Sequence, residues 1–265
     1  MTAIDPKQVF SARVHDYIKS RPGYPSQVID TLVQGCGLCP GWRVADIGSG
    51  TGLLARLFLD FGCTVWGVEP NEEMRQAGEQ ILAGYPAFRS QPGSAEATGL
   101  ADGSLDLVCA GMAFHWFDAR RARDEFQRIL APGGWVALVW NRMLTGPVPF
   151  MQQFTGLILE YAPGWTETRR RDGSGSGLDL PGFFRGVYQR TAFPLEQQLD
   201  WDSLYRRALS IAHLPPSDDL AHPGQPLHYR VSKPGVATQP GRFTWAASLF
   251  GPTTDTLAGT ERLQR

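Results

Sequence analysis

Hydrophobic residues follow two alternating spacings along the first half of the chain, from about residue 26 to residue 141. Helical spacing, with apolar residues three and four positions apart, predicts helices over 26–34, 53–61, 72–82 and 119–130. Short apolar runs predict strands over 42–47, 64–69, 88–91, 105–111 and 135–140. Helices and strands that alternate in this way indicate an α/β fold built on a parallel sheet.

The regular alternation of helical and strand spacing ends after Asn141. The pattern predicts an amphipathic helix over 151–161, an Arg-, Gly- and Ser-rich mobile surface loop over 162–182, a strand over 187–193 and a helix over 201–212. From residue 222 to residue 265, Gly and Pro are frequent and only 242–250 has the spacing of a strand. We therefore expect an atypical, poorly ordered tail, and the abrupt change in composition also fits a shifted reading frame.

Composition and charge narrow the class of protein. The 265 residues carry 25 Lys and Arg against 26 Asp and Glu, which argues against broad binding to nucleic acid or to an anionic membrane. The first residues lack the basic and apolar parts of a secretory signal, and no apolar stretch is long enough to cross a bilayer. The four cysteines are scattered and follow no metal-ligand pattern. We expect a soluble cytoplasmic protein without a disulfide framework or a metal.

The most informative segment runs from Val44 to Leu53 and reads Val-Ala-Asp-Ile-Gly-Ser-Gly-Thr-Gly-Leu. It ends the first predicted strand and opens a helix, where ligands bind in open α/β sheets. Gly48, Gly50 and Gly52 remove side chains from the turn, so a ligand can lie against the backbone and its N–H groups. A plain Gly-rich turn between strand and helix is the alternative.

The spacing of the glycines separates two kinds of cofactor. A dinucleotide fingerprint, Gly-x-Gly-x-x-Gly, would place its third glycine at position 53, where this chain has Leu. Asp46 precedes the glycines, and a carboxylate there repels a pyrophosphate but attracts a ligand ammonium. This profile fits S-adenosylmethionine, which carries an ammonium and a sulfonium but no phosphate.

The second predicted strand ends at Val68-Glu69-Pro70, and Glu69 lies 21 positions after Gly48. An acidic side chain at this strand end can accept hydrogen bonds from both ribose hydroxyls of a nucleoside cofactor. A solvated residue that caps the following helix is the alternative for Glu69.

These segments resemble the first motifs of the class I S-adenosylmethionine-dependent methyltransferases. The segment from Asp102 to Phe117, with His115-Trp-Phe at its end, is similar to the fourth-strand motif of small-molecule methyltransferases related to the trans-aconitate methyltransferases. Ala131-Pro-Gly-Gly before the fifth strand also matches the family. The resemblance implies a Rossmann-like, doubly wound and mostly parallel α/β sheet with a helical cap, and S-adenosylmethionine as cofactor.

The resemblance also implies a division of the chain and a set of cofactor contacts. The expected parts are an N-terminal cap segment (1–25), a cofactor-binding core (26–141), the end of the sheet with an acceptor-side cap (142–221) and the tail (222–265). The implied cofactor-binding residues are Asp46, Gly48, Ser49, Gly50, Gly52, Glu69, Pro70, Ser94, Ala95, Glu96, Ala110, Tyr17 and Arg21.

Two of these contacts have alternatives. Ser94 stands where the family usually has an Asp that contacts the adenine amino group, so this contact is open between Ser94, Glu96 and a backbone N–H. Tyr17 and Arg21 belong to a segment similar to the one that closes over the cofactor in family members of this type. A surface helix followed by a rigid turn is the alternative for that segment.

Methyl transfer from a sulfonium is a direct displacement, so the enzyme mainly aligns the methyl donor with the nucleophile. A protonated nucleophile needs a base, whereas a carboxylate acceptor needs none. His115 follows the fourth strand and is the candidate base, and a packing role beside Trp116 is its alternative. We expect a small-molecule acceptor, no nucleic acid or membrane partner, and a monomer or homodimer.

Two other functions compete with methyl transfer. A nicotinamide-dependent oxidoreductase on a similar fold is opposed by the glycine spacing and by Asp46. A non-catalytic S-adenosylmethionine-binding protein is suggested by the unusual tail. Binding without turnover on any acceptor would favour the latter.

Overall fold

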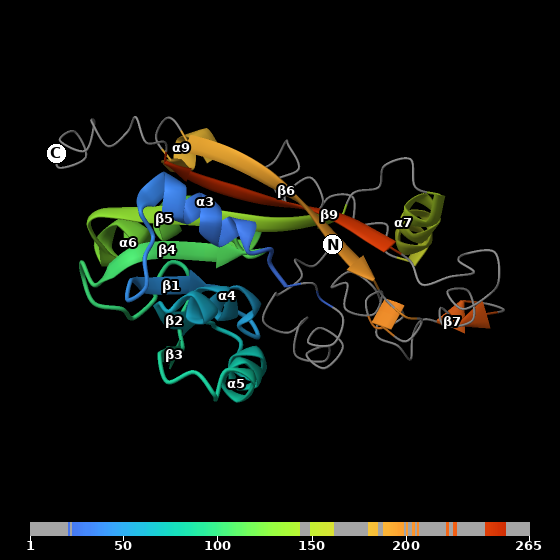
Figure 1. Cartoon of the computed structure of the whole chain (residues 1–265). Coiled ribbons are helices and arrows are strands. Elements are labelled where there is room, and N and C mark those ends of the chain that lie inside the picture. The colour runs from blue at the N-terminus through green and yellow to red at the C-terminus, as the bar shows by residue number, and fades with distance from the viewer. Residues whose placement is uncertain are drawn as a thin grey trace. The chain divides into compact units, whose positions relative to one another are not determined.

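The parallel sheet predicted from the sequence is present in the computed structural model of the chain (Figure 1). The structure describes residues 21, 23–143, 149–161, 180–184, 188–198, 200, 203–204, 206, 221–222, 225–226 and 242–252. The chain divides into two compact units. The second unit comprises 23–141, 178–193 and 247–265, and it contains the glycine-rich segment and all the predicted elements up to residue 141.

The second unit alternates strands and helices along its length. Its strands are β1 (Arg43–Ile47), β2 (Thr64–Val68), β3 (Phe88–Gln91), β4 (Leu105–Gly111) and most of β5 (Leu130–Met143). Its helices are α3 (Gln27–Cys36), α4 (Leu53–Phe61), α5 (Glu72–Ile81), the 3-10 turn η1 (Phe114–Trp116), α6 (Ala119–Ile129) and α9 (Leu180–Phe184). Outside this unit lie α7 (Pro149–Tyr161), β7 (Ala221–His222) and β8 (Gln225–Pro226).

Seven strands form one sheet in the order β3-β2-β1-β4-β5-β9-β6, in which β6 is Tyr188–Gln198 and β9 is Arg242–Pro252, while β7 and β8 pair with each other. The pairs β1–β2, β1–β4, β2–β3 and β4–β5 are all parallel. The chain order reverses beside β1, because β2 lies on one side of it and β4 on the other. Ligands bind outside the carboxyl ends of the strands at such a reversal.

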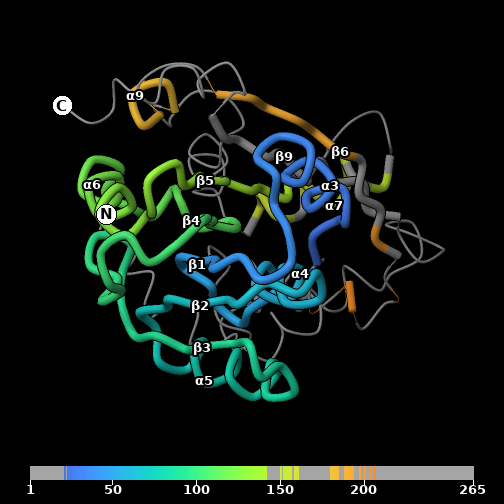
Figure 2. The backbone as a smooth tube through the Cα atoms, turned by 60° about the vertical axis from the view of Figure 1, so that its left-hand side comes forward, coloured from blue at the N-terminus to red at the C-terminus, as the bar shows by residue number. Residues whose placement is uncertain are grey.

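Helices cover both faces of the sheet, as Figure 2 shows for α3 and α4 on one side and α6 on the other. One apolar core joins the side chains of α3 and α4 to Val44, Val65 and Leu107 on the sheet. The other joins α6 and α9 to Ala45, Val68 and their neighbours. Strand residues alternate between the two cores, as they must when both faces are buried.

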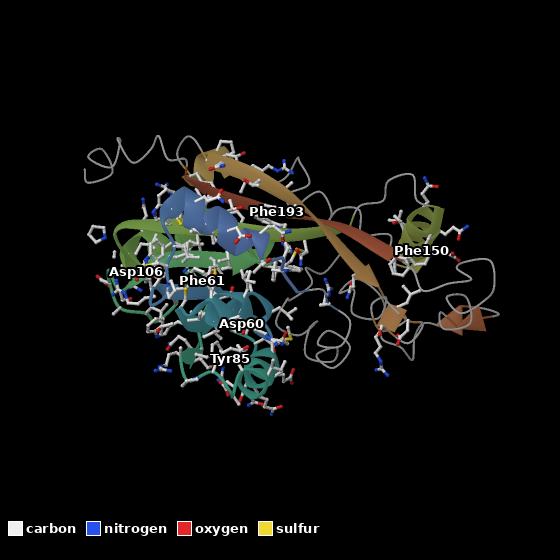
Figure 3. The ribbon with its side chains drawn as sticks, in the orientation of Figure 1. Asp60, Phe61, Tyr85, Asp106, Phe150 and Phe193 are labelled. Atoms are coloured by element: carbon white, nitrogen blue, oxygen red, sulfur yellow. The ribbon has the colours of Figure 1, made fainter. Side chains whose placement is uncertain are left out.

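The amino ends of β1 and β4 are joined by an ion pair. The guanidinium of Arg43 donates to Asp106 through Nε (3.0 Å) and Nη2 (2.6 Å), and its backbone N–H donates to the same carboxylate at 2.8 Å. Figure 3 shows Asp106 where β4 begins. This contact fixes the register of the two strands at the end of the sheet opposite the glycine-rich turn.

The predicted elements agree with the structure to within a few residues over most of the second unit. The ranges 53–61, 88–91 and 105–111 are confirmed at both ends, and the strand predicted in the tail is present as β9. The fifth strand was placed too narrowly, since β5 extends from Leu130 to Met143. The strand pairing is irregular between Leu105 and Leu107, where β5 accommodates the Pro-Gly-Gly segment.

The predicted end of the surface loop was wrong. The surface loop expected over 162–182 overlaps α9, because Leu180 and Phe183 are buried. The ring of Phe183 packs edge-on against Phe126 of α6 and Phe114 of η1, which holds this short helix against α6 and the η1 turn. Residues 162–179 lie outside the described part of the chain, as does most of the helix predicted over 201–212.

Within the described part of the chain, none of the helices combines the length and the apolar character that a bilayer crossing requires.

Candidate functional site

The candidate site lies at the carboxyl ends of β1, β2, β4 and β5. These parallel strands end at one edge of the sheet, and the glycine-rich turn connects β1 to α4 there. The turn is tied to the next strand, because the backbone N–H groups of Gly48 and Ser49 both donate to the carbonyl oxygen of Val68, at 2.8 and 3.1 Å. The first predicted motif and the end of β2 are therefore held together by backbone hydrogen bonds.

All three glycines of the turn have left-handed backbone conformations, with φ of 68° at Gly48, 55° at Gly50 and 83° at Gly52. A Cβ at Gly48 would lie 2.6 Å from the Cβ of Ala113, and a Cβ at Gly52 would lie 2.5 Å from Leu82 Cδ1. The sequence suggested that the missing side chains leave room for a ligand. The structure shows a different reason at these two positions, since protein side chains already occupy the space.

Glu69 follows β2, and backbone donors bind both of its carboxylate oxygens. Oε2 accepts from the N–H of Gly50 at 2.8 Å, and Oε1 accepts from the N–H of Asn71 at 2.8 Å. The side chain is 8% exposed, and burial raises the pKa of Glu69. A carboxylate oxygen has two lone pairs, so each oxygen keeps the capacity to accept one more hydrogen bond. The helix-capping role considered for Glu69 belongs instead to Asn71, whose Oδ1 accepts from Met74 N.

Asp46 is more deeply buried than the sequence suggested. It is 1% exposed, and its Oδ2 accepts from the backbone N–H of Ala55, in the first turn of α4, at 3.0 Å. Burial raises the pKa of Asp46 to about 7, and the nearby charge of Glu69 adds to the rise, while the Ala55 hydrogen bond opposes it. Asp46 thus anchors the first turn of the helix. Its predicted contact with a ligand ammonium stays a prediction.

The residues expected at the adenine lie in the loop between β3 and β4. Ser94 and Ala97 close this loop through two backbone hydrogen bonds of 3.1 and 3.2 Å, and Ala95 is buried. The carboxylate of Glu96 accepts from the backbone N–H of Asp118, at the start of α6, at 2.9 Å. Glu96 thus binds the start of α6 through one oxygen, and the choice between Ser94, Glu96 and a backbone N–H as the adenine contact stays a prediction.

His115 lies in the turn η1 directly after β4. Its ring is 5.1 Å from the ring of Trp116, and it is partly buried. The neighbouring Phe114 is buried and packs edge-on against Trp140, so the turn is fixed by its aromatic anchor. Ala110 is buried within β4, one residue before the strand ends. Of the N-terminal pair, Arg21 is described and partly buried, while Tyr17 lies outside the described residues.

The structure adds Asn141 and Met112 to this edge, and neither was predicted from the sequence. The Asn141 side chain is 6% exposed, its Nδ2 donates to Gly23 O at 3.0 Å, and its backbone N–H donates to Met112 Sδ at 3.1 Å. Among the described residues, its buried Oδ1 has no hydrogen-bond donor and the buried hydroxyl of Thr51 has no hydrogen-bond partner. Buried polar atoms without partners are uncommon and often mark ligand sites.

Met112 has a φ of 55°, the one positive value among the described residues other than glycine. Backbone strain of this kind collects at functional sites. The signal that could have revealed Asn141 is its position, because it is the first polar residue after the apolar run 135–140 and lies two residues before the end of β5.

Comparisons with known proteins agree with this geometry. Residues 45–138 match the family of methyltransferase domains. The chain is 38% identical over 132 residues to an uncharacterised methyltransferase of Mycobacterium bovis, a match that covers 50% of this chain and 51% of the relative. It is 30% identical over 152 residues to one of Schizosaccharomyces pombe, which covers 57% of this chain and 59% of the relative. The matches thus span little more than half the length of these relatives.

Solved structures share the fold. A protein of Anaeromyxobacter dehalogenans, described as a candidate type II methyltransferase, superposes with a TM-score of 0.59 at 20% identity, over 88% of this chain and 97% of that one. The YcgJ protein of Bacillus subtilis superposes with a TM-score of 0.51 at 23% identity, over 85% and 96%. At these identities the likeness concerns the fold, and it confirms the Rossmann-like sheet predicted from the sequence.

Proposed function

We propose that this chain, in which residues 45–138 match the family of methyltransferase domains, is a class I methyltransferase that binds S-adenosylmethionine at the carboxyl edge of its sheet and transfers the methyl group to a small-molecule acceptor. The observation that carries the proposal is the link between Glu69 and Gly50, at 2.8 Å. It joins an acidic side chain at the end of β2 to the glycine turn at the end of β1. The adenosine and methionine parts of the cofactor would lie across the ends of these two strands.

The residues at this edge fit the chemistry of that cofactor. Each oxygen of Glu69 can accept one further hydrogen bond, which suits the two neighbouring hydroxyls of a ribose. Asp46 and Glu69 bring two acidic groups to this edge, and backbone N–H groups bind both. A cofactor with a positive sulfonium and ammonium suits such an edge, whereas a pyrophosphate is repelled by it. The fit therefore favours S-adenosylmethionine over a nicotinamide dinucleotide.

In the proposed mechanism this chain mainly positions and shields the reactants. S-adenosylmethionine, when bound, supplies an electrophilic methyl group on its sulfonium. The glycine turn and Glu69 would hold the cofactor at the ends of β1 and β2. The end of β4 and the η1 turn lie beside β1, so they would face the acceptor side. Holding the two reactants in line lowers the barrier by several kcal/mol, on the order of 7 to 11 in the most favourable cases.

His115 would accept the proton of an acceptor that carries one. A histidine titrates near neutral pH, and η1 places His115 just beyond β4. The buried Oδ1 of Asn141, at the end of β5, would accept a hydrogen bond from an acceptor N–H or O–H. Both residues favour a hydroxyl or amine acceptor over a free carboxylate, which needs no base.

A turnover assay tests the proposal. The full chain is incubated with S-adenosylmethionine and separate sets of phenols, amines and carboxylic acids, and S-adenosylhomocysteine is quantified by mass spectrometry. We expect product with members of the first two sets, a loss of at least tenfold in kcat/KM for His115→Ala, and a normal rate for Glu79→Ala, which removes a glutamate of α5 that binds Arg75.

Two results would count against it. Cofactor binding without product from any set would favour the non-catalytic reading. Failure to bind S-adenosylmethionine would contradict the proposed function itself.

A further inference from the structure

Two glutamates fasten the loop between β3 and β4 to α6. Glu96 leaves the loop and accepts from the backbone N–H of Asp118 at 2.9 Å. Glu125 reaches the loop from α6, and its Oε1 accepts from both the N–H (2.8 Å) and the hydroxyl (2.5 Å) of Thr98. The segment 94–98, which we call the adenine loop, is therefore held to one helix at two points.

The second point is a buried and charged anchor. Thr98 is 0% exposed, and its hydroxyl also accepts from the N–H of Leu100 at 3.2 Å. Arg128 donates to both oxygens of Glu125 and to the carbonyl of Leu100, so the anchor continues into the next residues of the loop. The guanidinium of Arg128 and the Thr98 donors lower the pKa of Glu125 to about 2, so the carboxylate is ionised at neutral pH.

The first point connects the adenine loop to the turn that contains His115. Asp118 caps α6, since its side chain accepts from the N–H groups of Arg120 and Arg121 at 3.1 Å. Asp118 is separated from η1 by a single residue. The backbone N–H that Glu96 binds therefore lies three residues beyond His115. A carboxylate that binds a backbone N–H in this way holds the adenine loop and the η1 turn at a fixed separation.

We propose that Glu96 and Glu125 are positioning residues that fix the adenine loop against the base of the cofactor, and that Glu96 does so without contacting the base. This inference rests on the proposed function, because it concerns the same cofactor. Adenine presents an amino donor beside a ring acceptor, whereas hypoxanthine presents an oxygen acceptor beside a ring donor. A loop with fixed backbone groups distinguishes these two patterns, and a loop released from α6 adapts to either.

Calorimetric titration of the full chain with S-adenosylhomocysteine and with S-inosylhomocysteine tests this inference. We expect the wild-type chain to prefer the adenine compound, and Glu96→Ala and Glu125→Ala to reduce that preference by about tenfold. Glu96→Gln keeps an oxygen that can accept from Asp118 N–H, so it should restore most of the preference. Glu79→Ala is the matched control, because Glu79 also accepts from a hydroxyl on another element, Ser90 at 2.6 Å, but lies outside the adenine loop.

The ratio of the two affinities is informative because a general loss of stability would weaken the binding of both ligands equally. An unchanged ratio in Glu96→Ala and Glu125→Ala would overturn the inference, as would an equal fall in Glu79→Ala. If the wild-type chain bound neither ligand, the proposed function and this inference would fail together. Binding of S-adenosylhomocysteine with an unchanged ratio in the variants would overturn the inference alone.

Discussion

The acidic residues at the two ends of the parallel strands, called here the amino edge and the carboxyl edge of the sheet, lie in opposite electrostatic environments. At the amino edge, Asp106 is paired with the guanidinium of Arg43, and this cation lowers the pKa of the Asp106 carboxyl. At the carboxyl edge, Asp46 and Glu69 are buried with backbone N–H groups as hydrogen-bond partners, and burial raises the pKa of both. The same kind of side chain is thus paired with a cation at the amino ends of the strands, whereas at the carboxyl ends it is buried with backbone N–H partners and its charged form is disfavoured.

This difference separates stability from function within one sheet. At the amino edge, Arg43 and Asp106 bind each other, and this contact fixes the register of β1 and β4. The carboxyl edge collects two features that cost free energy in the absence of a ligand, namely the strained backbone of Met112 and the buried oxygen of Asn141, which has no donor among the described residues. Proteins tolerate such features where they bind or react. Changes at the two edges should therefore have different consequences.

The largest effect is expected from Gly48→Ala. The added Cβ would lie 2.6 Å from Ala113 Cβ at a φ of 68°, so we expect a loss of about 3 kcal/mol of unfolding free energy and no measurable cofactor binding. Gly37→Ala is the matched control, with a φ of 74° but nothing within 4 Å of the new Cβ. It should cost about 1 kcal/mol and leave binding unchanged. Equal losses in chemical denaturation would show that packing against Ala113 is unimportant.

Glu69→Ala should act mainly on binding. It removes the acceptor of the Gly50 and Asn71 N–H groups and the proposed ribose contacts, so we expect the affinity for S-adenosylhomocysteine to fall about a hundredfold, or about 2.7 kcal/mol. Glu69→Gln, which keeps one oxygen, should lose less. Calorimetry measures both, and an unchanged affinity would exclude Glu69 from the cofactor site.

Asp46→Asn should change how stability depends on pH. The pKa of Asp46 is about 7 in the folded chain and about 3.9 when unfolded. The folded state therefore holds a proton that the unfolded state releases, and this contribution is complete below pH 4 and lost as the pH rises through 7. The variant cannot ionise, so between pH 4 and pH 8 it should gain about 4 kcal/mol relative to wild type. Unfolding free energies are measured by denaturation at several pH values. If those of wild type and Asp46→Asn changed with pH in parallel, the raised pKa of Asp46 would be refuted.

The smallest effect is expected at the amino edge. The Arg43 side chain is 44% exposed, so Asp106→Asn should cost only about 1 kcal/mol of unfolding free energy. The affinity for S-adenosylhomocysteine should stay within about twofold of wild type, because Asp106 lies at the other end of β4. A large loss of affinity in this variant would contradict the separation between the two edges.

The sequence predicted the positions of the elements better than the contacts made by their side chains. The glycine turn and the range 53–61 were found because glycine spacing and helical periodicity are local signals. The helix α9 was missed because it is short and is held by the packing of Phe183 on Phe126, which no local pattern reveals.

The same limit applies to the candidate site. The acidic residues could be predicted because they stand at the ends of apolar strands. The hydrogen bond between Glu96 and Asp118, which are 22 positions apart, depends on how the loop folds back on α6 and could not be predicted. The unsatisfied oxygen of Asn141 is likewise a property of burial, since its neighbour Gly23 is 118 positions away.

The most direct test of this account is a calorimetric titration of the wild-type chain and of Glu69→Ala with S-adenosylmethionine, S-adenosylhomocysteine and NADH. We expect the wild-type chain to bind the first two ligands and not NADH, and Glu69→Ala to lose this binding while it retains its unfolding transition. Binding of NADH alone, or S-adenosylmethionine binding that is unaffected by the loss of Glu69, would contradict it.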